Sequence, residues 1–295
     1  MIWDDGPYYD LNAPTLVGFA QGVSTDQRRP FFSKFGWNIP LQYFGNDASN
    51  HYNSLQTKVE KRFGHGYSFL AHYTYAHAKS STTNLYHESP QATAIWYGRP
   101  DYIRDHVVVG TNIWELPFGK GKRFLGNVSK AADLVVGGWE ITDNTTWMSG
   151  GGFNTGYAEC GTDNDIGNCH PDRIGSTSVS NQSASHWYAI ATTPLVNNGD
   201  TSGPWRRPQV GVLGTDVRNS LIGPKWFQTD ASLIKNFAIR EQVRAQFRAE
   251  FFNLFNHVNL GNPNGCVDCS TAGQIFNLAN NAIMRRLQFA VRVEF

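Results

Sequence analysis

The chain has 295 residues with a formal net charge of +1; 17% of the residues are charged and 14% are aromatic. This balance excludes the basic surface of a nucleic-acid-binding protein, and no run approaches the roughly 18 to 20 apolar residues of a transmembrane helix. The 29 glycines and 3 methionines favour many strands and tight turns over helices.

The N-terminal part, residues 1–50, is rich in Pro, Gly and aromatic residues and shows little periodicity. It predicts an outer loop with a partial upstream strand near 39–44. Two runs that alternate apolar and polar side chains follow at 52–63 and 67–79, joined by a glycine-containing link at 64–66. Alternating runs with such a link predict a β-hairpin.

A long polar loop is expected at 80–105, followed by a strand at 106–116. One side of this strand carries Val107, Val109, Thr111 and Ile113. Apolar residues at helical spacing predict a short helix within 124–136, and a strand returns at 139–149. The polar stretch 150–225 is longer than the loops of compact soluble domains.

The last part of the chain predicts three strands, at 227–237, 242–255 and 285–295, with a long loop at 256–280. The run at 242–255 contains good helix formers, but in a helix its polar residues would lie on every side. At a period of two they share one face, which favours a strand. The terminal strand is apolar on one face and mostly polar on the other, so it separates two different media.

Two regularities favour lipid as the medium on the apolar side. Short connections alternate with long loops, as in outer-membrane barrels, where short turns face the periplasm and long loops face the exterior. Aromatic residues gather at both ends of the strands, as the two aromatic girdles of a barrel would. The girdle residues are Phe63, Tyr67, Trp139, Phe237 and Phe295 at the short turns, and Tyr73, Tyr75, Trp147, Phe251 and Phe255 at the long loops.

The second face is too charged for the core of a sandwich but could line a wet lumen. The expected lumen-facing residues are Arg244, Arg248, Glu250, Arg292 and Glu294. The expected lipid-facing residues are Val243, Phe247, Phe251, Phe289, Val291 and Val293. Asp143 shares its side with Trp139 and Trp147 and would face lipid, unless a bulge or a register shift turned it inward. The predicted fold is an all-β, antiparallel transmembrane barrel segment of about seven or eight strands.

Five motifs stand in a fixed order along the chain. They are YNSLQTKVEKRF at 52–63, WELPFGKGKRF at 114–124, GGW at 137–139, FRAEFFNLFNH at 247–257 and NLGNP at 259–263. Their order and spacing resemble the C-terminal part of the Oar-like TonB-dependent receptors. The resemblance covers most of the chain from Tyr52 onward, and residues 8–50 are similar to the preceding outer loop more loosely.

The resemblance implies a barrel of about 22 strands plugged by an N-terminal domain, with a terminal aromatic residue, here Phe295, that is read by the outer-membrane assembly machinery. The implied partners are outer-membrane lipid, that machinery, an unknown extracellular ligand and, through the plug, the TonB system. The sequence shows no signal peptide, plug or TonB box. We therefore expect a fragment that does not transport by itself.

Four cysteines lie in two of the expected outer loops, Cys160 and Cys169 in one, Cys266 and Cys269 in the other. Export favours disulfides, and we predict one within each pair. Free thiols are an alternative for both pairs. Half of a zinc site or a redox pair is a further alternative for Cys266 and Cys269.

No catalytic, cofactor or metal motif is evident, so we expect neither an enzyme nor a cofactor. Asp163 and Asp165 lack the spacing and the closing Glu of a calcium loop. Some outer-loop aromatic residues could stack on sugars, although packing within the loops is the simpler interpretation. They are Trp96, Tyr97, Trp187, Tyr188 and Trp205.

The sequence therefore predicts part of a TonB-dependent receptor or transporter barrel in the outer membrane of a Gram-negative bacterium. It would contribute lumen wall and extracellular ligand-capture loops. A structural or adhesive outer-membrane barrel is the first alternative, and a soluble β-rich carbohydrate-binding protein is the second.

Overall fold

The computed structural model describes residues 8–44, 49–81, 86–87, 93–159, 169–238 and 243–295. Within these residues, no helix is both long and apolar enough to cross a membrane. The helices are η1 Asp26–Arg28, α1 Phe32–Phe35, α2 Thr93–Trp96 and α3 Lys130–Val136.

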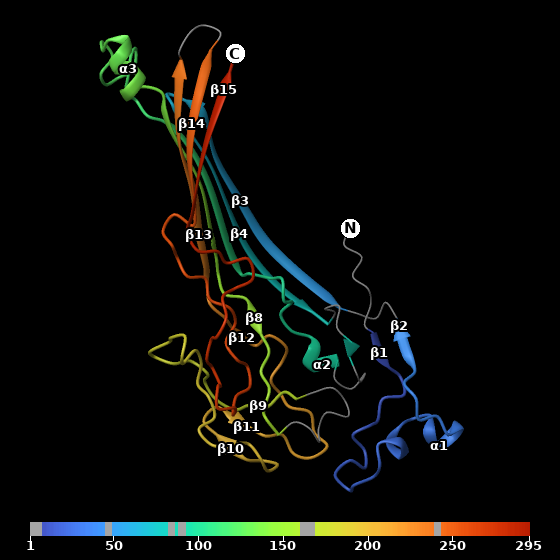
Figure 1. The fold of residues 1–295 in the computed structure, drawn as a ribbon. Coiled ribbons are helices and arrows are strands. Elements are labelled where there is room, and N and C mark those ends of the chain that lie inside the picture. The colour runs from blue at the N-terminus through green and yellow to red at the C-terminus, as the bar shows by residue number, and fades with distance from the viewer. Residues whose placement is uncertain (1–7, 45–48, 82–85, 88–92, 160–168, 239–242) are drawn as a thin grey trace.

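Seven strands form one antiparallel sheet, in the order β15-β14-β13-β7-β6-β4-β3. Their bounds are β3 Asn50–Gly64, β4 Tyr67–Ser80, β6 His106–Glu115, β7 Trp139–Met148, β13 Trp226–Ala238, β14 Arg244–Phe252 and β15 Arg286–Glu294. Figure 1 shows these strands as one elongated, twisted layer. Helix α3 and the C-terminus lie at one end of the layer, and the short strands and long loops gather at the other.

Each of the seven expected strands has a counterpart in this sheet, and the largest difference is at the end of β14. The strand stops at Phe252, because Asn253 turns the chain with a φ of 52°. The Asn253 side-chain amide donates to the carbonyls of His257 and Ile283, at 2.9 and 2.8 Å. The strand therefore ends before residue 255, where its end was expected, because the Asn253 side chain stabilises a tight turn after Phe252.

Helix α3 is also shorter than the range 124–136 in which a helix was expected. Its N-cap is Ser129, whose hydroxyl accepts a hydrogen bond from the Ala132 amide at 3.2 Å. Upstream, Leu125 has a φ of 58°, which a helix does not allow. The preceding residues form a loop closed by a bridge between Phe118 and Phe124.

Short strands build the end of the molecule opposite α3. Three of them form the sheet β2-β1-β5: β1 Tyr8–Asp10, β2 Gln42–Phe44 and β5 Tyr86–His87. Three more form the sheet β10-β11-β9: β9 Asp172–Arg173, β10 Thr201–Ser202 and β11 Trp205–Arg206. The last two pair with each other: β8 Gly152–Phe153 and β12 Leu221–Ile222.

The described parts of 150–225 and 256–280 pack together into what we call the outer-loop unit. Its apolar core consists of Phe153, Tyr157, Tyr188, Ala191, Leu195, Trp205, Leu221 and Val267. Leu195, Trp205 and Val267 are fully buried. The described part of 150–225 is therefore a packed unit, because isolated apolar residues spread through polar sequence meet in one core.

The edge strands of the long sheet are β3 and β15, which are each paired on one side only within the described residues. Every neighbouring pair in this sheet is antiparallel. Because the two edges stand first and seventh in the order, β3 and β15 run in the same direction.

Candidate functional site

One face of the long sheet, here called the apolar face, is mostly apolar. It carries the expected lipid-facing residues Phe247, Phe251, Phe289, Val291 and Val293, which the register of β14 and β15 places together. Phe289 and Val291 are 65% and 72% exposed. Val243 lies one residue ahead of β14. An exposed apolar face that runs along neighbouring strands suits lipid rather than water. Contact of these residues with lipid stays a prediction.

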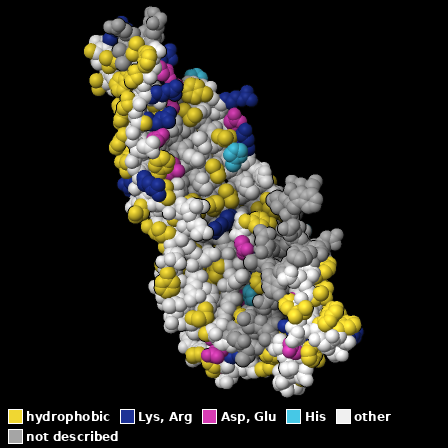
Figure 2. Space-filling model, turned by 45° about the vertical axis from the view of Figure 1, so that its right-hand side comes forward, with side chains coloured by type: hydrophobic (Ala, Val, Ile, Leu, Met, Phe, Trp, Pro, Cys, Tyr) yellow, Lys and Arg dark blue, Asp and Glu magenta, His cyan; other side chains and the backbone are white. Residues whose placement is uncertain are grey.

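The opposite, polar face carries the expected lumen-facing residues Arg244, Arg248, Glu250, Arg292 and Glu294. Ion pairs join neighbours on this face, Arg248 to Glu250 at 3.4 Å and Arg292 to Glu294 at 2.7 Å. Figure 2 shows charged side chains over the strands and hydrophobic side chains along the edge of the same view. Their position in a lumen also stays a prediction.

Asp143 lies on the apolar face, and no bulge turns it away. The register of β7 is continuous on both sides, with Asp143 opposite Asn112 of β6 and Ala231 of β13. The Asn112 amide donates to the Asp143 carboxylate at 3.1 Å, and the Tyr67 hydroxyl donates to the Asn112 carbonyl oxygen at 2.9 Å. These bonds satisfy polar groups that would otherwise be costly in apolar surroundings.

The same row of polar contacts continues across the sheet from Asp143. The Thr145 hydroxyl lies 3.5 Å from the Asp143 carboxylate and 2.9 Å from the hydroxyl of Thr229 on β13. Thr229 is buried. Sequence reasoning found Asp143 as an exception but missed its partners, because alternation along one strand says nothing about which residue lies opposite.

Strand β6 is an exception to the division into an apolar and a polar face. Residues paired across neighbouring strands point to the same face, and Val109 is paired with His72, which is paired with Lys58. The side of β6 that carries Val109 therefore belongs to the polar face of the sheet. The apolar face receives Val108, Gly110, Asn112 and Trp114 instead. The polar face is therefore partly apolar in the middle of the sheet.

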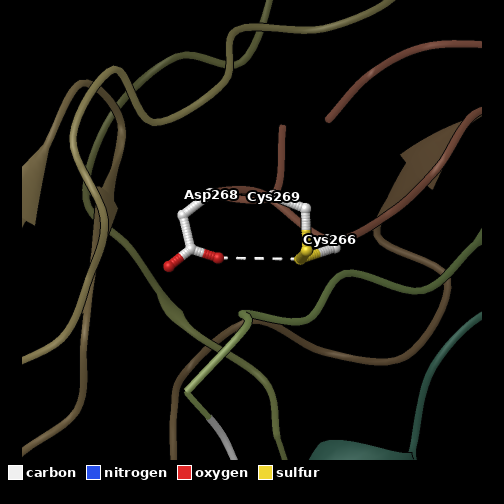
Figure 3. A group of neighbouring side chains, drawn as sticks. All are labelled: Cys266, Asp268 and Cys269. Carbon is white, nitrogen blue, oxygen red and sulfur yellow. Dashed lines mark hydrogen bonds between the residues drawn. A yellow bond between two sulfur atoms is a disulfide. The ribbon is translucent and has the colours of Figure 1, made fainter. Parts of the chain in front are cut away.

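In the outer-loop unit, Cys266 and Cys269 are joined by a disulfide, with a Cα–Cα distance of 5.5 Å. Figure 3 shows the Asp268 carboxylate beside this bond, 3.6 Å from Sγ of Cys266. Sulfur atoms in a disulfide supply no thiolate, so this trio is not a metal site in this state. Cys169 is disulfide-bonded as well, and Cys160 lies outside the described residues.

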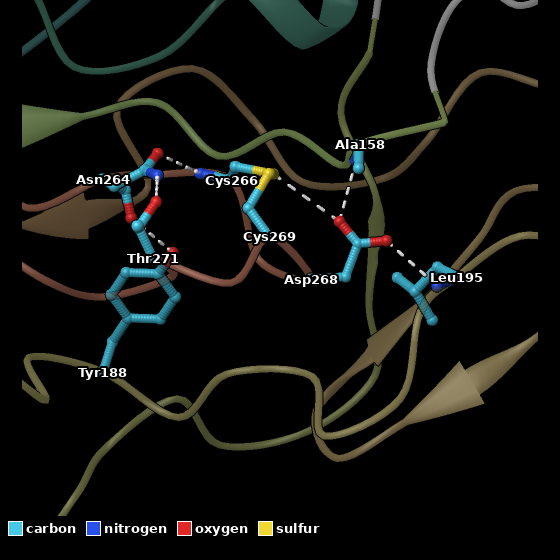
Figure 4. The surroundings of a disulfide bond; sticks show 8 residues. All are labelled: Ala158, Tyr188, Leu195, Asn264, Cys266, Asp268, Cys269 and Thr271. Carbon is cyan, nitrogen blue, oxygen red and sulfur yellow. Dashed lines mark hydrogen bonds between the residues drawn. A yellow bond between two sulfur atoms is a disulfide. The ribbon is translucent and has the colours of Figure 1, made fainter.

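The loop closed by this disulfide fastens three segments together. The Asp268 carboxylate accepts the amide hydrogens of Ala158 and Leu195 at 2.8 and 2.9 Å (Figure 4). Val267 between the two cysteines is fully buried, and its carbonyl accepts the Ala191 amide at 2.8 Å. The short Cys-x-x-Cys loop therefore anchors the outer-loop unit as a structural element.

Buried charged and titratable groups hold the same unit in place. Arg218 is fully buried and donates to Asp101 at 2.9 Å, and Asp172 pairs with Arg206 at 2.8 Å. Burial lowers the pKa of His170, against the opposing charge of Asp216. Burial also raises the pKa of the Tyr188 hydroxyl, which donates to the Asn264 carbonyl at 2.7 Å.

Four of the five aromatic residues considered for sugar stacking take part in the packing of the unit. Tyr188 and Trp205 are 3% and 0% exposed and belong to its core. Trp187 is partly buried, and its indole N–H donates to the Ile222 carbonyl at 2.8 Å. Trp96 packs edge-on against His170, with ring centroids 5.9 Å apart. Packing explains these four residues.

An antiparallel sheet with one exposed apolar face, one charged face and long loops at one end defines an outer-membrane β-barrel protein. A family model described as an outer membrane beta barrel domain matches residues 6–288, and the chain belongs to this family. The protein is therefore one of the cell outer membrane, which does not suit the soluble carbohydrate-binding alternative. A search of the curated proteins found no match.

Proposed function

We propose that this chain forms part of the barrel wall of a TonB-dependent receptor and that its outer-loop unit takes part in ligand capture. The proposal rests on one observation. The long sheet has an apolar and a polar face, and the compact outer-loop unit is attached to one end of its strands. The role proposed is capture and passage of a ligand, without a catalytic step. Motifs such as FRAEFFNLFNH at 247–257 support the finer assignment.

Strand direction supports a barrel larger than this sheet. If β3 and β15 met directly, they would pair in parallel, whereas bacterial barrels contain an even number of antiparallel strands. An odd number of further strands between them restores antiparallel pairing throughout. Any barrel with an even total number of strands meets this condition, because the sheet supplies seven of them. The plugged outer-membrane transporters, with about 22 strands, are of this kind.

In this proposal, short turns such as the β3–β4 link face the periplasm and the outer-loop unit faces the exterior. The polar face lines the plugged lumen. Phe295, fully exposed at the end of the chain, is the signal for the barrel assembly machinery. Energy reaches the barrel through a plug domain that contacts the TonB system.

The genomic sequence in frame ahead of Met1 tests this function most cheaply. We expect a plug domain and a TonB box there. A passenger or stalk domain of an adhesin in that position would contradict the receptor assignment, although the outer-membrane location would stand.

An adhesive barrel protein is the second candidate, and the filled core of the outer-loop unit favours it. Leu195, Trp205 and Val267 are fully buried in this core, which suits a unit that makes contacts through its surface. Cells that display the chain should bind a surface or a partner cell if the protein is an adhesin. They should show no such binding if it is a receptor wall.

A further inference from the structure

A cavity of about 250 Å³ lies in the outer-loop unit, between the segment 177–188 and strand β12, at the end of the molecule opposite α3 (Figure 1). Three of its lining residues are buried and three are exposed, so the cavity opens to the surface of the unit. None of the lining residues is charged. They are Thr177, Ser178, Val179, Gln182, Trp187, Tyr188, Leu221 and Ile222.

The Trp187 ring is held in a fixed orientation at this cavity. It packs against the core of the unit, and its indole N–H donates to the Ile222 carbonyl at 2.8 Å. The Trp187 amide donates to the Gly273 carbonyl at 3.0 Å. Packing therefore fixes Trp187 in place but leaves open the cavity that it lines. An aromatic wall that is already ordered lowers the entropy cost of binding a ligand.

The cavity also offers hydrogen-bonding groups that the fold leaves available. The Gln182 amide donates to the Trp187 carbonyl at 2.9 Å, and its oxygen has no partner among the described residues. The Ser178 hydroxyl likewise has no partner within the part of the chain that the structure describes. The Thr177 hydroxyl accepts from the Arg173 guanidinium at 3.2 Å, which leaves its own hydrogen available to donate. Donors and acceptors are thus both present.

These features select the chemistry of the ligand. A cavity without charged side chains offers no counter-charge to an ionic ligand, whose desolvation would be costly. A sugar ring has hydroxyl groups at its edge and C–H groups on its faces, so it matches polar side chains beside an indole ring. The volume is smaller than the roughly 300 to 1,000 Å³ of pockets for drug-sized ligands, which suits a single sugar residue.

We propose that this cavity binds one neutral sugar residue, with a C–H face of the ring against Trp187 and its hydroxyls bonded to Ser178 and Gln182. The inference rests on the proposed role of the outer-loop unit in ligand capture and names the ligand class. The two fail separately. A plug domain encoded upstream without sugar binding would leave the receptor and remove this site. Sugar binding with an adhesin domain upstream would keep the site and remove the receptor.

Saturation-transfer difference NMR of the refolded full chain, in an amine-oxide detergent that contains no sugar, tests the proposal. The probes are the methyl glycosides of glucose, galactose and mannose. We expect saturation transfer to the ring hydrogens of at least one probe, with a dissociation constant of roughly 1 mM for a ligand of this size. The variant S178A/Q182A loses the hydrogen bonds of two side chains and should bind about 30-fold more weakly.

The matched control S180A/Q209A replaces the same residue types at exposed positions of the outer-loop unit that do not line the cavity. It should bind as the wild type does. The absence of saturation transfer to all three glycosides would overturn the proposal, and so would equal binding by S178A/Q182A and the wild type. Full displacement of the glycoside by glycerol at the same concentration would overturn it too, since stacking on Trp187 would then contribute nothing.

If S178A/Q182A does not refold, the wild type labelled with 5-fluorotryptophan still decides. The fluorine resonance of Trp187 is assigned as the one that is missing from the spectrum of W187F. We expect this resonance to shift when the bound glycoside is added. An unchanged Trp187 resonance at a saturating concentration of the glycoside would contradict the site.

Discussion

At the scale of single residues, hydrogen bonding decides where a polar group can lie in an apolar face. Asp143 stands among apolar neighbours because Asn112 donates to it and Tyr67 in turn donates to Asn112. The row crosses β4, β6 and β7 and needs the observed register of all three. A charged residue in this position therefore indicates a cross-strand network rather than an irregular strand.

We expect D143A to lower the free energy of unfolding by about 1 to 3 kcal/mol, because it leaves the Asn112 amide without its acceptor. Urea unfolding of the chain in phospholipid vesicles, followed by tryptophan fluorescence, measures the change. The control N144A alters the next residue, which is exposed on the opposite face. A loss no larger than that of N144A would show that the network contributes nothing.

His170 makes the stability of the outer-loop unit depend on pH. The residue is 5% exposed, and burial lowers its pKa below the usual value near 6.5. The unfolded chain therefore binds the proton more readily than the folded one. The stabilisation is complete above a pH of about 6.5 and is lost as the pH falls towards the lowered pKa.

Amide hydrogen exchange of the outer-loop unit should therefore speed up between neutral and mildly acidic pH beyond its intrinsic pH dependence. H170Q should flatten this change, and H186Q, at an exposed position of the same unit, should keep it. Wild-type behaviour in H170Q would assign the pH dependence to another group.

At the scale of elements, the Cys-x-x-Cys loop and the outer-loop unit depend on each other. We expect C266S/C269S to destabilise the unit by about 2 kcal/mol through lost loop-closure entropy, and more if Asp268 leaves its two amide partners. Limited proteolysis should then cleave the outer-loop unit faster while the long strands stay protected. Unchanged cleavage of the unit would contradict an anchoring role for this disulfide.

The long strands were predictable because each carries its own signal. Phe247, Arg248, Ala249 and Glu250 alternate regardless of what lies beside them, so the pattern alone shows both faces of β14. The outer-loop unit was not predictable, since Tyr188 and Asn264 or Leu195 and Asp268 meet from distant positions. Strand β6 shows the same limit, because its apolar side is clear in the sequence but the face it joins depends on its neighbours.

At the scale of the whole molecule, the sheet separates two media over the length of its strands. The apolar face is exposed on β15, where Phe289, Val291 and Val293 are 54 to 72% accessible. On the opposite, polar face, one ion pair lies on β14 and one on β15. The chain belongs to an outer-membrane barrel family, and barrels of this kind have lipid on one side of the wall and water on the other. Such surroundings would suit both the apolar and the polar face.

The most direct test of this division compares two adjacent residues of β14 in a bilayer. Phe247→Arg places a charge in the middle of the apolar face and should cost about 2 to 4 kcal/mol in the free energy of unfolding. Arg248→Leu changes the polar face and should cost less than about 1 kcal/mol. Urea unfolding of both variants in phospholipid vesicles measures the difference. Equal losses at the two positions would contradict a sheet that faces lipid on one side and water on the other.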